Sequence, residues 1–276
     1  MSWSWSTAPA SDEEARAMTN RKRKFRYFLV GALLPVTLLV VWQLLGSLGL
    51  LSTLLFPPPL KIGGALMKLA SSGELAEHLQ VSLLRALAGF ALGGGAGLIV
   101  GTLVGLFRKT EKALDPTVQM IRMVPHLAIA PLFVLWFGIG ELSKVLLIAT
   151  GAFFPLYINT FLGIRNLDNK LFEVARVLGF SRGKQIVKLV LPAALPNILL
   201  GVRISLGVSW LGLVVAEIMG STSGIGYLMS EARQFSKTPI VFVGILVFAA
   251  VGKLTDSLVR WLERLSLQWR DHYPGG

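Results

Sequence analysis

Residues 86–107 read ALAGFALGGGAGLIVGTLVGLF, a stretch without a charged side chain. A helix of about 20 mostly apolar residues is long enough to cross the hydrocarbon core of a bilayer. Charged side chains are also missing from residues 27–60, 123–140 and 145–164. The sequence therefore predicts an all-α membrane protein whose long apolar stretches are transmembrane helices.

The composition of the 276 residues agrees with this prediction: 53% are hydrophobic, 15% are charged, and the mean hydropathy is +0.65. These values exclude a soluble domain, an intrinsically disordered chain and a collagen-like repeat. The chain has no cysteine. This excludes disulfides, thiolate metal sites, thiol nucleophiles and cysteine-linked lipids.

We predict six transmembrane helices, at Tyr27–Leu51, Ala86–Phe107, Met123–Phe137, Val145–Gly163, Ile198–Met219 and Pro239–Leu258. The first is longer than the apolar core of a signal peptide, which has about 7 to 15 residues, and no clear small-x-small cleavage site follows it. Three prolines at 57–59 end this helix, and a short helix outside the membrane is expected before the second span. The predicted domains are an N-terminal tail (1–26), a transmembrane domain (27–265) and a C-terminal tail (266–276).

The net charge of +12 is distributed as in a protein that weaves through a membrane. Lys and Arg gather before the first span, in the connections after the second and fourth spans, and beyond the sixth. The alternate connections are poorer in basic residues. By the positive-inside rule both termini are cytoplasmic. The basic run at residues 21–26 is then an orientation signal in contact with lipid headgroups, and nucleic-acid binding is not needed to explain the charge.

Glycine recurs every fourth residue in the second predicted span, at Gly89, Gly93, Gly97, Gly101 and Gly105. Lipid provides no hydrophobic force between helices, so a continuous groove of small residues indicates close packing against another helix. The alternative, a glycine-rich phosphate-binding loop, requires a loop that leads into a soluble helix, and this segment is neither.

Ionisable and helix-breaking residues occur inside two predicted spans. Arg203 and Glu217 share the fifth span, about 21 Å apart at 1.5 Å per residue, so each needs another partner or water. Pro125 and Pro131 predict a kinked or broken third span whose free carbonyls need partners. His126 lies between the two prolines, and two interpretations remain open: a packed histidine bonded to the backbone, or a donor that faces a pore.

The connection between the fourth and fifth spans, residues 165–195, contains most of the run EVARVLGFSRGKQIVKLVLPAALP (173–196). Gly179 is predicted to cap a helix over residues 171–178. A second helix should begin near Arg182 and reach the membrane near Pro192. These features predict two short, exposed cytoplasmic helices joined by a glycine.

This loop resembles the EAA motif of the integral-membrane subunits of bacterial ABC importers. The positions that keep the spacing of the motif are Glu173, Ala175, Gly179, Leu191 and Pro192. Val174 and Leu189 depart from its usual residues, both with apolar replacements. The resemblance implies that the loop couples this chain to a separate ATP-binding subunit. That subunit would hold ATP and Mg²⁺, and this chain would hold no metal or cofactor and would not itself be an enzyme.

The resemblance extends over most of the chain, including SGELAEHLQVSLLRALAGFALG (72–93) and GVRISLGVSWLGLVVAEIM (201–219). These stretches are similar to the branch that serves aliphatic sulfonates, taurine, nitrate and related small anions, and most like alkanesulfonate permeases. The resemblance implies a type I importer permease fold and a homodimer in the bacterial inner membrane. It also implies two cytoplasmic ATP-binding subunits and a periplasmic substrate-binding protein. Taurine, nitrate and bicarbonate remain alternative substrates.

The candidate residues for the translocation path are His126, Trp136, Asn159, Arg203, Trp210 and Glu217. A self-contained secondary transporter is an alternative, for which the charged residues within the fifth span are the best evidence. Paired inverted repeats, which would support it, are not visible. A membrane-embedded enzyme is disfavoured because the three histidines are scattered and no carboxylate cluster or serine-base arrangement accompanies them.

Overall fold

The computed structural model describes residue 31 and residues 33–267, which form helices and connecting turns without a β-strand. The chain divides into two compact units, residues 1–64 and 65–276. The first unit contains the apolar helix Leu33–Ser47 and the beginning of α2 (Pro59–Ser71). The predicted short helix before the second span is therefore present, but the prediction that the prolines end the first helix is wrong, because this helix ends at Ser47 and α2 begins at the last of the three prolines. The predicted start of the first span and nearly all of both predicted tails lie outside the described residues.

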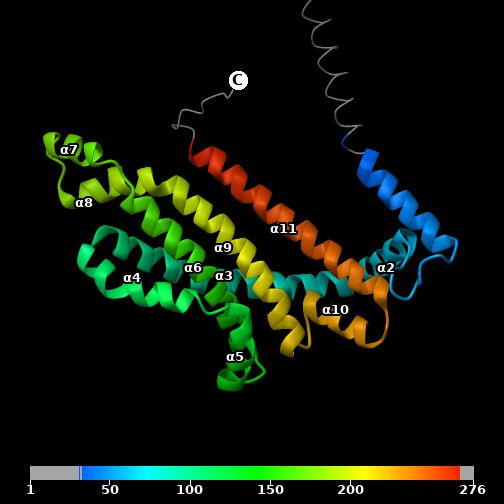
Figure 1. Cartoon of the computed structure of the whole chain (residues 1–276). Coiled ribbons are helices and arrows are strands. Elements are labelled where there is room, and N and C mark those ends of the chain that lie inside the picture. The colour runs from blue at the N-terminus through cyan, green and yellow to red at the C-terminus, as the bar shows by residue number, and fades with distance from the viewer. Residues whose placement is uncertain (1–30, 32, 268–276) are drawn as a thin grey trace, which may run out of the picture. The chain divides into compact units, whose positions relative to one another are not determined.

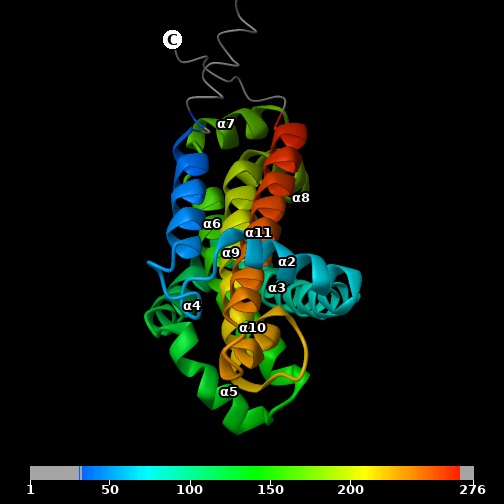
Figure 2. The same cartoon turned by 90° about the vertical axis from the view of Figure 1, so that its right-hand side faces the viewer.

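Four described helices are long and apolar enough to cross a membrane. They are α3 (Glu74–Leu106), α6 (Glu141–Arg165), α9 (Leu191–Gly220), which continues a helical segment from Arg182, and α11 (Thr238–Ser266). Figures 1 and 2 show α6, α9 and α11 running alongside one another. Two shorter helical segments that meet at a sharp bend, Arg108–Arg122 and His126–Phe137, can together form a fifth span. With the apolar helix Leu33–Ser47, these elements correspond to the six predicted spans.

The predicted boundaries of the third span are wrong. Instead of one helix over Met123–Phe137, the structure has α4 (Arg108–Arg122), the 3-10 turn η1 (His126–Ile129) and α5 (Ala130–Phe137). The two arms are bent by 78°. Pro125 in an extended conformation precedes η1, and a second proline stands in the first turn of α5. The charges of residues 108–122 suggested a loop, although they belong to an amphipathic helix.

Two other differences have a similar cause. Helix α3 begins at Glu74, well before the predicted Ala86, directly after Gly73, whose φ of 80° is left-handed. The connection between α9 and α11 contains a short helix, α10 (Ile225–Gln234), that the sequence did not predict. Both segments are too polar to be detected by a search for apolar stretches, yet their backbone is helical.

Helix α6 lies between α3 and α9. A Cβ added to Gly93 would lie 1.9 Å from the carbonyl oxygen of Ala149, and one on Gly97 would lie 2.4 Å from that of Phe153. All five regularly spaced glycines of α3 face α6 in this way. On the other side of α6, Ser205 Oγ of α9 donates a hydrogen bond of 2.6 Å to the carbonyl of Ala152. The small residues therefore let three backbones approach closely.

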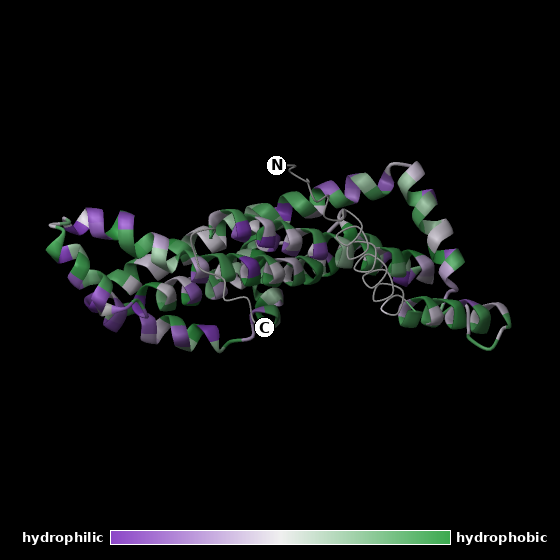
Figure 3. Cartoon of the chain, turned by 90° about the horizontal axis from the view of Figure 1, so that it is seen from above, coloured by the Kyte–Doolittle hydropathy of each residue, from purple (hydrophilic) through white to green (hydrophobic). Residues whose placement is uncertain are grey.

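The two ends of this three-helix core differ in character. Figures 1 and 2 both place α7 (Asn169–Val177) at one end of the long helices and α5 and α10 at the other. In Figure 3, hydrophobic residues cover most of the long helices, and hydrophilic residues gather at the end that holds α7 and α8 (Arg182–Gln185). Helix α11 is the least enclosed of the four long helices: 11% of the residues in its most apolar stretch are buried.

Candidate functional site

Gly179 ends α7 as the sequence predicted. Its φ of 67° is in the left-handed region. The amide of Phe180 donates to the carbonyl of Ala175 at 2.9 Å, and the amide of Gly179 donates to Arg176 at 3.0 Å. This pair of bonds is a Schellman motif, which satisfies the last carbonyls of a helix and favours glycine at the left-handed position. At the other end, Asp168 caps α7 through the amide of Lys170.

The second helix of the loop follows at once. Ser181 caps α8, which continues through the π-helix η2 (Ile186–Val190) into α9. Leu191 and Pro192 therefore stand at the junction where η2 passes into α9. The side-chain amide of Gln185 donates to the carbonyl of Phe180 at 2.9 Å. These contacts give the joint between α7 and α8 a defined geometry.

The outer surface of this loop is apolar although it faces away from the helix core. Val174, Val177 and Leu178 are 56%, 88% and 61% exposed, and Glu173 is exposed beside them. Ala175 is buried on the inner side of α7. An exposed apolar patch rimmed by charged residues is typical of a surface that another protein covers. The geometry therefore makes α7 and α8 a candidate docking element.

At the opposite end, Arg85 of α3 connects three other segments. Its guanidinium forms two bonds of 2.6 Å with the carboxylate of Glu141 on α6. The same group donates to Glu217 on α9 at 2.9 Å and to the carbonyl of Ser223 at 2.6 Å. Arg85 and Glu217 are 5% and 1% exposed. A guanidinium can donate five hydrogen bonds, which explains how one side chain joins so many elements.

The same cluster caps α10. Three successive backbone amides at its start each donate to a side chain of α3 or α9: Gly224 to His78 Nδ1 at 3.0 Å, Ile225 to Ser82 Oγ at 2.9 Å and Gly226 to Glu217 Oε2 at 2.8 Å. A carboxylate here also complements the positive end of the helix dipole. Glu217, a predicted path residue, is thus enclosed in the protein, with Arg85 as its charged partner.

Arg203 and Trp210 lie together on the seam between α9 and α11. Arg203 Nε is 2.6 Å from Asp256 Oδ1, and the other oxygen of this carboxylate pairs with Arg260. The indole nitrogen of Trp210 donates to the carbonyl of Phe248 at 2.9 Å. Asp256 was not among the predicted site residues, because it lies 53 residues from Arg203 and no local pattern links the two.

The other path candidates lie elsewhere. His126 packs against Gly151 of α6, and its Nε2 is buried without a hydrogen-bond partner among the described residues. Asn159 donates to the carbonyl of Pro155 at 2.8 Å. Trp136 is 63% exposed on α5. Arg203 and Trp210 therefore both face α11, about two turns apart on α9, and the remaining candidates lie at separate positions.

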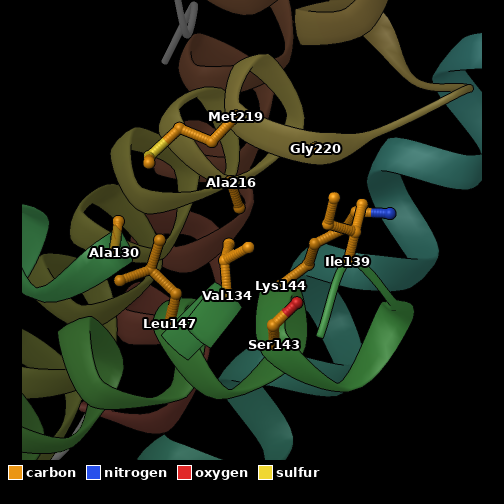
Figure 4. Close-up of a pocket in the computed structure, with 9 residues that line it drawn as sticks. All are labelled: Ala130, Val134, Ile139, Ser143, Lys144, Leu147, Ala216, Met219 and Gly220. Carbon is orange, nitrogen blue, oxygen red and sulfur yellow. The ribbon is translucent and has the colours of Figure 1, made fainter. Parts of the chain in front are cut away.

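A cavity near α5 is too small for a substrate. Figure 4 shows its mostly apolar lining from α5, α6 and α9, including Val134, Leu147 and Met219. Its volume is about 10 Å³, which is the space of a single water molecule. Lys144 borders it and carries its amine to 3.0 Å from Glu141 Oε1. A larger cavity, of about 310 Å³, lies beside Arg203 at the seam between α9 and α11.

Residues 93–266 match the family described as binding-protein-dependent transport system inner membrane component. The chain is 58% identical to "Putative aliphatic sulfonates transport permease protein SsuC" of Bacillus subtilis, over 95% of both chains. It is 37% identical to the taurine transport system permease protein TauC of Escherichia coli, over 84% of this chain and 86% of that one.

Among solved structures, the fold is similar to a chain of the MetNI methionine ABC transporter. The TM-score is 0.56 at 18% identity, over 69% of this chain and 97% of the other. The predicted type I ABC importer permease fold is therefore confirmed. The chain belongs to the family of binding-protein-dependent transport system inner membrane components, and it is a permease subunit of an ABC importer.

Proposed function

We propose that this chain forms the translocation path of an ATP-driven importer for aliphatic sulfonates. The observation that carries the substrate class is the 58% identity, over 95% of both chains, to a relative named for aliphatic sulfonates. The cavity beside Arg203 supports an anionic substrate, because a guanidinium binds the oxygens of such a group well.

The energy comes from a partner in this proposal. Two ATP-binding subunits, with ATP and Mg²⁺, dock on residues 165–195 of two copies of this chain. Glu173, Ala175 and Gly179 transmit the motion, and Leu191 and Pro192 join the loop to α9. The exposed apolar face of α7 supports this role, because it offers a surface for another protein to cover. A periplasmic binding protein delivers the substrate at the other end.

The orientation follows from the charge distribution. Both termini and the α7–α8 loop face the cytoplasm, and α10 faces the periplasm, in the inner membrane of a bacterium. The path runs past Arg203 and Trp210. Glu217 has no place in it, because its carboxylate is occupied by Ser82, Arg85 and the amide of Gly226.

A growth test distinguishes the substrates. A strain that lacks this gene should lose growth on ethanesulfonate as sole sulfur source, keep growth on sulfate, and recover with the wild-type gene but not with Glu173→Lys. Loss of growth on taurine alone would favour a taurine permease, which the 37% identity to TauC makes the second candidate. Unchanged growth on ethanesulfonate, in a strain with no other sulfonate importer, would contradict the proposal.

A further inference from the structure

The seam between α9 and α11 has more positive than negative charge. Asp256 is shared by Arg203 and Arg260, one on each carboxylate oxygen. Lys253 lies one turn before Asp256 on the same helix. Two guanidiniums therefore share one carboxylate, so the paired group itself keeps one net positive charge. A further anion would be attracted here, most strongly where water is scarce.

These charges lie within their predicted spans, near one end. At 1.5 Å per residue, Arg203 is about 8 Å inside Ile198, where the fifth predicted span begins, and Asp256 is about 3 Å inside Leu258, where the sixth ends. The side chains of Arg203 and Asp256 are still 37% and 30% exposed. Charged groups that face hydrocarbon within a span are unfavourable. The exposed side of the ion pair must therefore face water or protein.

The space beside the ion pair has the size of a small-molecule site. Its volume is about 310 Å³, near the lower end of the range for ligand pockets. Gly207 and Gly252 keep it open: no atom lies within 4 Å of a Cβ built on Gly207. At Gly252 the nearest such atom belongs to the indole of Trp210, at 3.6 Å. Arg203 and Asp256 form the charged part of the lining, and apolar side chains such as Leu200 form the rest.

The guanidinium of Arg203 has N–H groups that are not used in its ion pair. Its Nε binds Asp256, and its two terminal nitrogens form no hydrogen bond with any of residues 33–267. A planar pair of N–H groups matches two oxygens of a carboxylate, phosphate or sulfonate group. Arg203 can therefore hold Asp256 and an external anion at the same time, or exchange one for the other.

We propose that this cavity binds the sulfonate group of the transported molecule, with Arg203 as its contact and Asp256 as a built-in competitor. This rests on the proposed function for the identity of the anion. When the cavity is empty, Asp256 keeps Arg203 from being left unpaired, which would be costly. When substrate arrives, the excess positive charge attracts it. Competition from Asp256 limits the affinity, so that the substrate can leave again.

The proposal predicts effects of opposite sign for the two partners of one ion pair. Ethanesulfonate binding is measured by calorimetry on the purified permease–ATPase complex without the binding protein. Arg203→Gln should weaken binding at least tenfold. Asp256→Asn should strengthen it several-fold, because the competing charge is removed. Glu111→Gln, which removes the acidic partner of Arg165 between α4 and α6, is the matched control and should leave binding unchanged.

A purely structural ion pair gives a different pattern, in which both seam variants weaken binding alike or neither changes it. Either result, or no binding by the wild-type complex, would overturn the proposal. Gly207→Leu provides a second test if a charge variant does not fold, since it fills the cavity without altering a charge; normal binding by this variant would also contradict the site. Uptake of ethanesulfonate by the same complex with its binding protein tests the proposed function separately. Binding that depends on Arg203 without uptake would contradict the proposed function alone.

Discussion

At the scale of single residues, the cluster around Arg85 holds together the end of the protein that contains α10. The carboxylate of Glu217 accepts hydrogen bonds from Ser82, Arg85 and the amide of Gly226. The buried guanidinium of Arg85 therefore balances its negative charge. A buried ion pair that loses one partner leaves the other unsatisfied, at a cost of about 3 to 5 kcal/mol.

Glu217→Gln should therefore lower the free energy of unfolding by about 3 kcal/mol, because Arg85 loses one of its two carboxylates and α10 loses the charge at its N-terminus. The measurement is thermal unfolding of the purified complex in detergent. Glu77→Gln removes an exposed carboxylate from the same end of α3 and should change stability by less than about 0.5 kcal/mol. Equal stability of both variants would show that the pair contributes nothing.

At the scale of elements, the packing of α3 on α6 depends on glycines, which have no side chain to separate the two backbones. Gly93→Ala would place a methyl group 1.9 Å from the backbone oxygen of Ala149, which cannot move aside as a side chain could. We expect a loss of about 3 kcal/mol in the same unfolding measurement, as for an overpacked core.

Gly95→Ala is the matched control, because nothing lies within 4 Å of its added Cβ. It should leave stability unchanged or raise it by up to about 1 kcal/mol, since alanine favours a helix over glycine. If Gly95→Ala destabilises the protein as much as Gly93→Ala, the loss is not caused by the close approach of α3 and α6.

The α7–α8 loop depends on one backbone conformation. Gly179→Ala puts a side chain on a residue with φ of 67°, which costs about 1 kcal/mol and favours other geometries of the joint. Uptake per ATP hydrolysed should fall several-fold while the protein still inserts into the membrane. Gly183→Ala, in α8 with open space around it, should couple normally. Normal coupling by Gly179→Ala would contradict the role assigned to the loop.

At the scale of the whole molecule, the proposed orientation can be tested directly because the chain has no cysteine. Val177→Cys on α7 and Gln234→Cys on α10 are both at exposed positions. In cells that express the permease without its ATPase, with a permeable outer membrane and an intact inner membrane, an impermeant maleimide should label Gln234→Cys and not Val177→Cys. Disruption of the inner membrane should make both reactive. The reverse pattern in intact cells would invert the topology.

The sequence predicted the long apolar helices and the glycine cap of α7, because both depend on local rules of hydrophobicity and backbone conformation. It did not predict α4 as a helix or α10 at all, since their polar faces hide their periodicity from a search for apolar spans. The partners of Arg203 and Glu217 could not be predicted either. Asp256 and Arg85 lie far from them in the chain, and only tertiary packing brings these pairs together.

The most direct test of the account is uptake of labelled ethanesulfonate into proteoliposomes that contain this permease with its ATPase and binding protein. Uptake should require ATP on the side of the ATPase and should be lost with Glu173→Lys, although the variant complex is inserted. Equal uptake by the permease alone, without ATPase or ATP, would contradict the account and identify a self-contained secondary transporter.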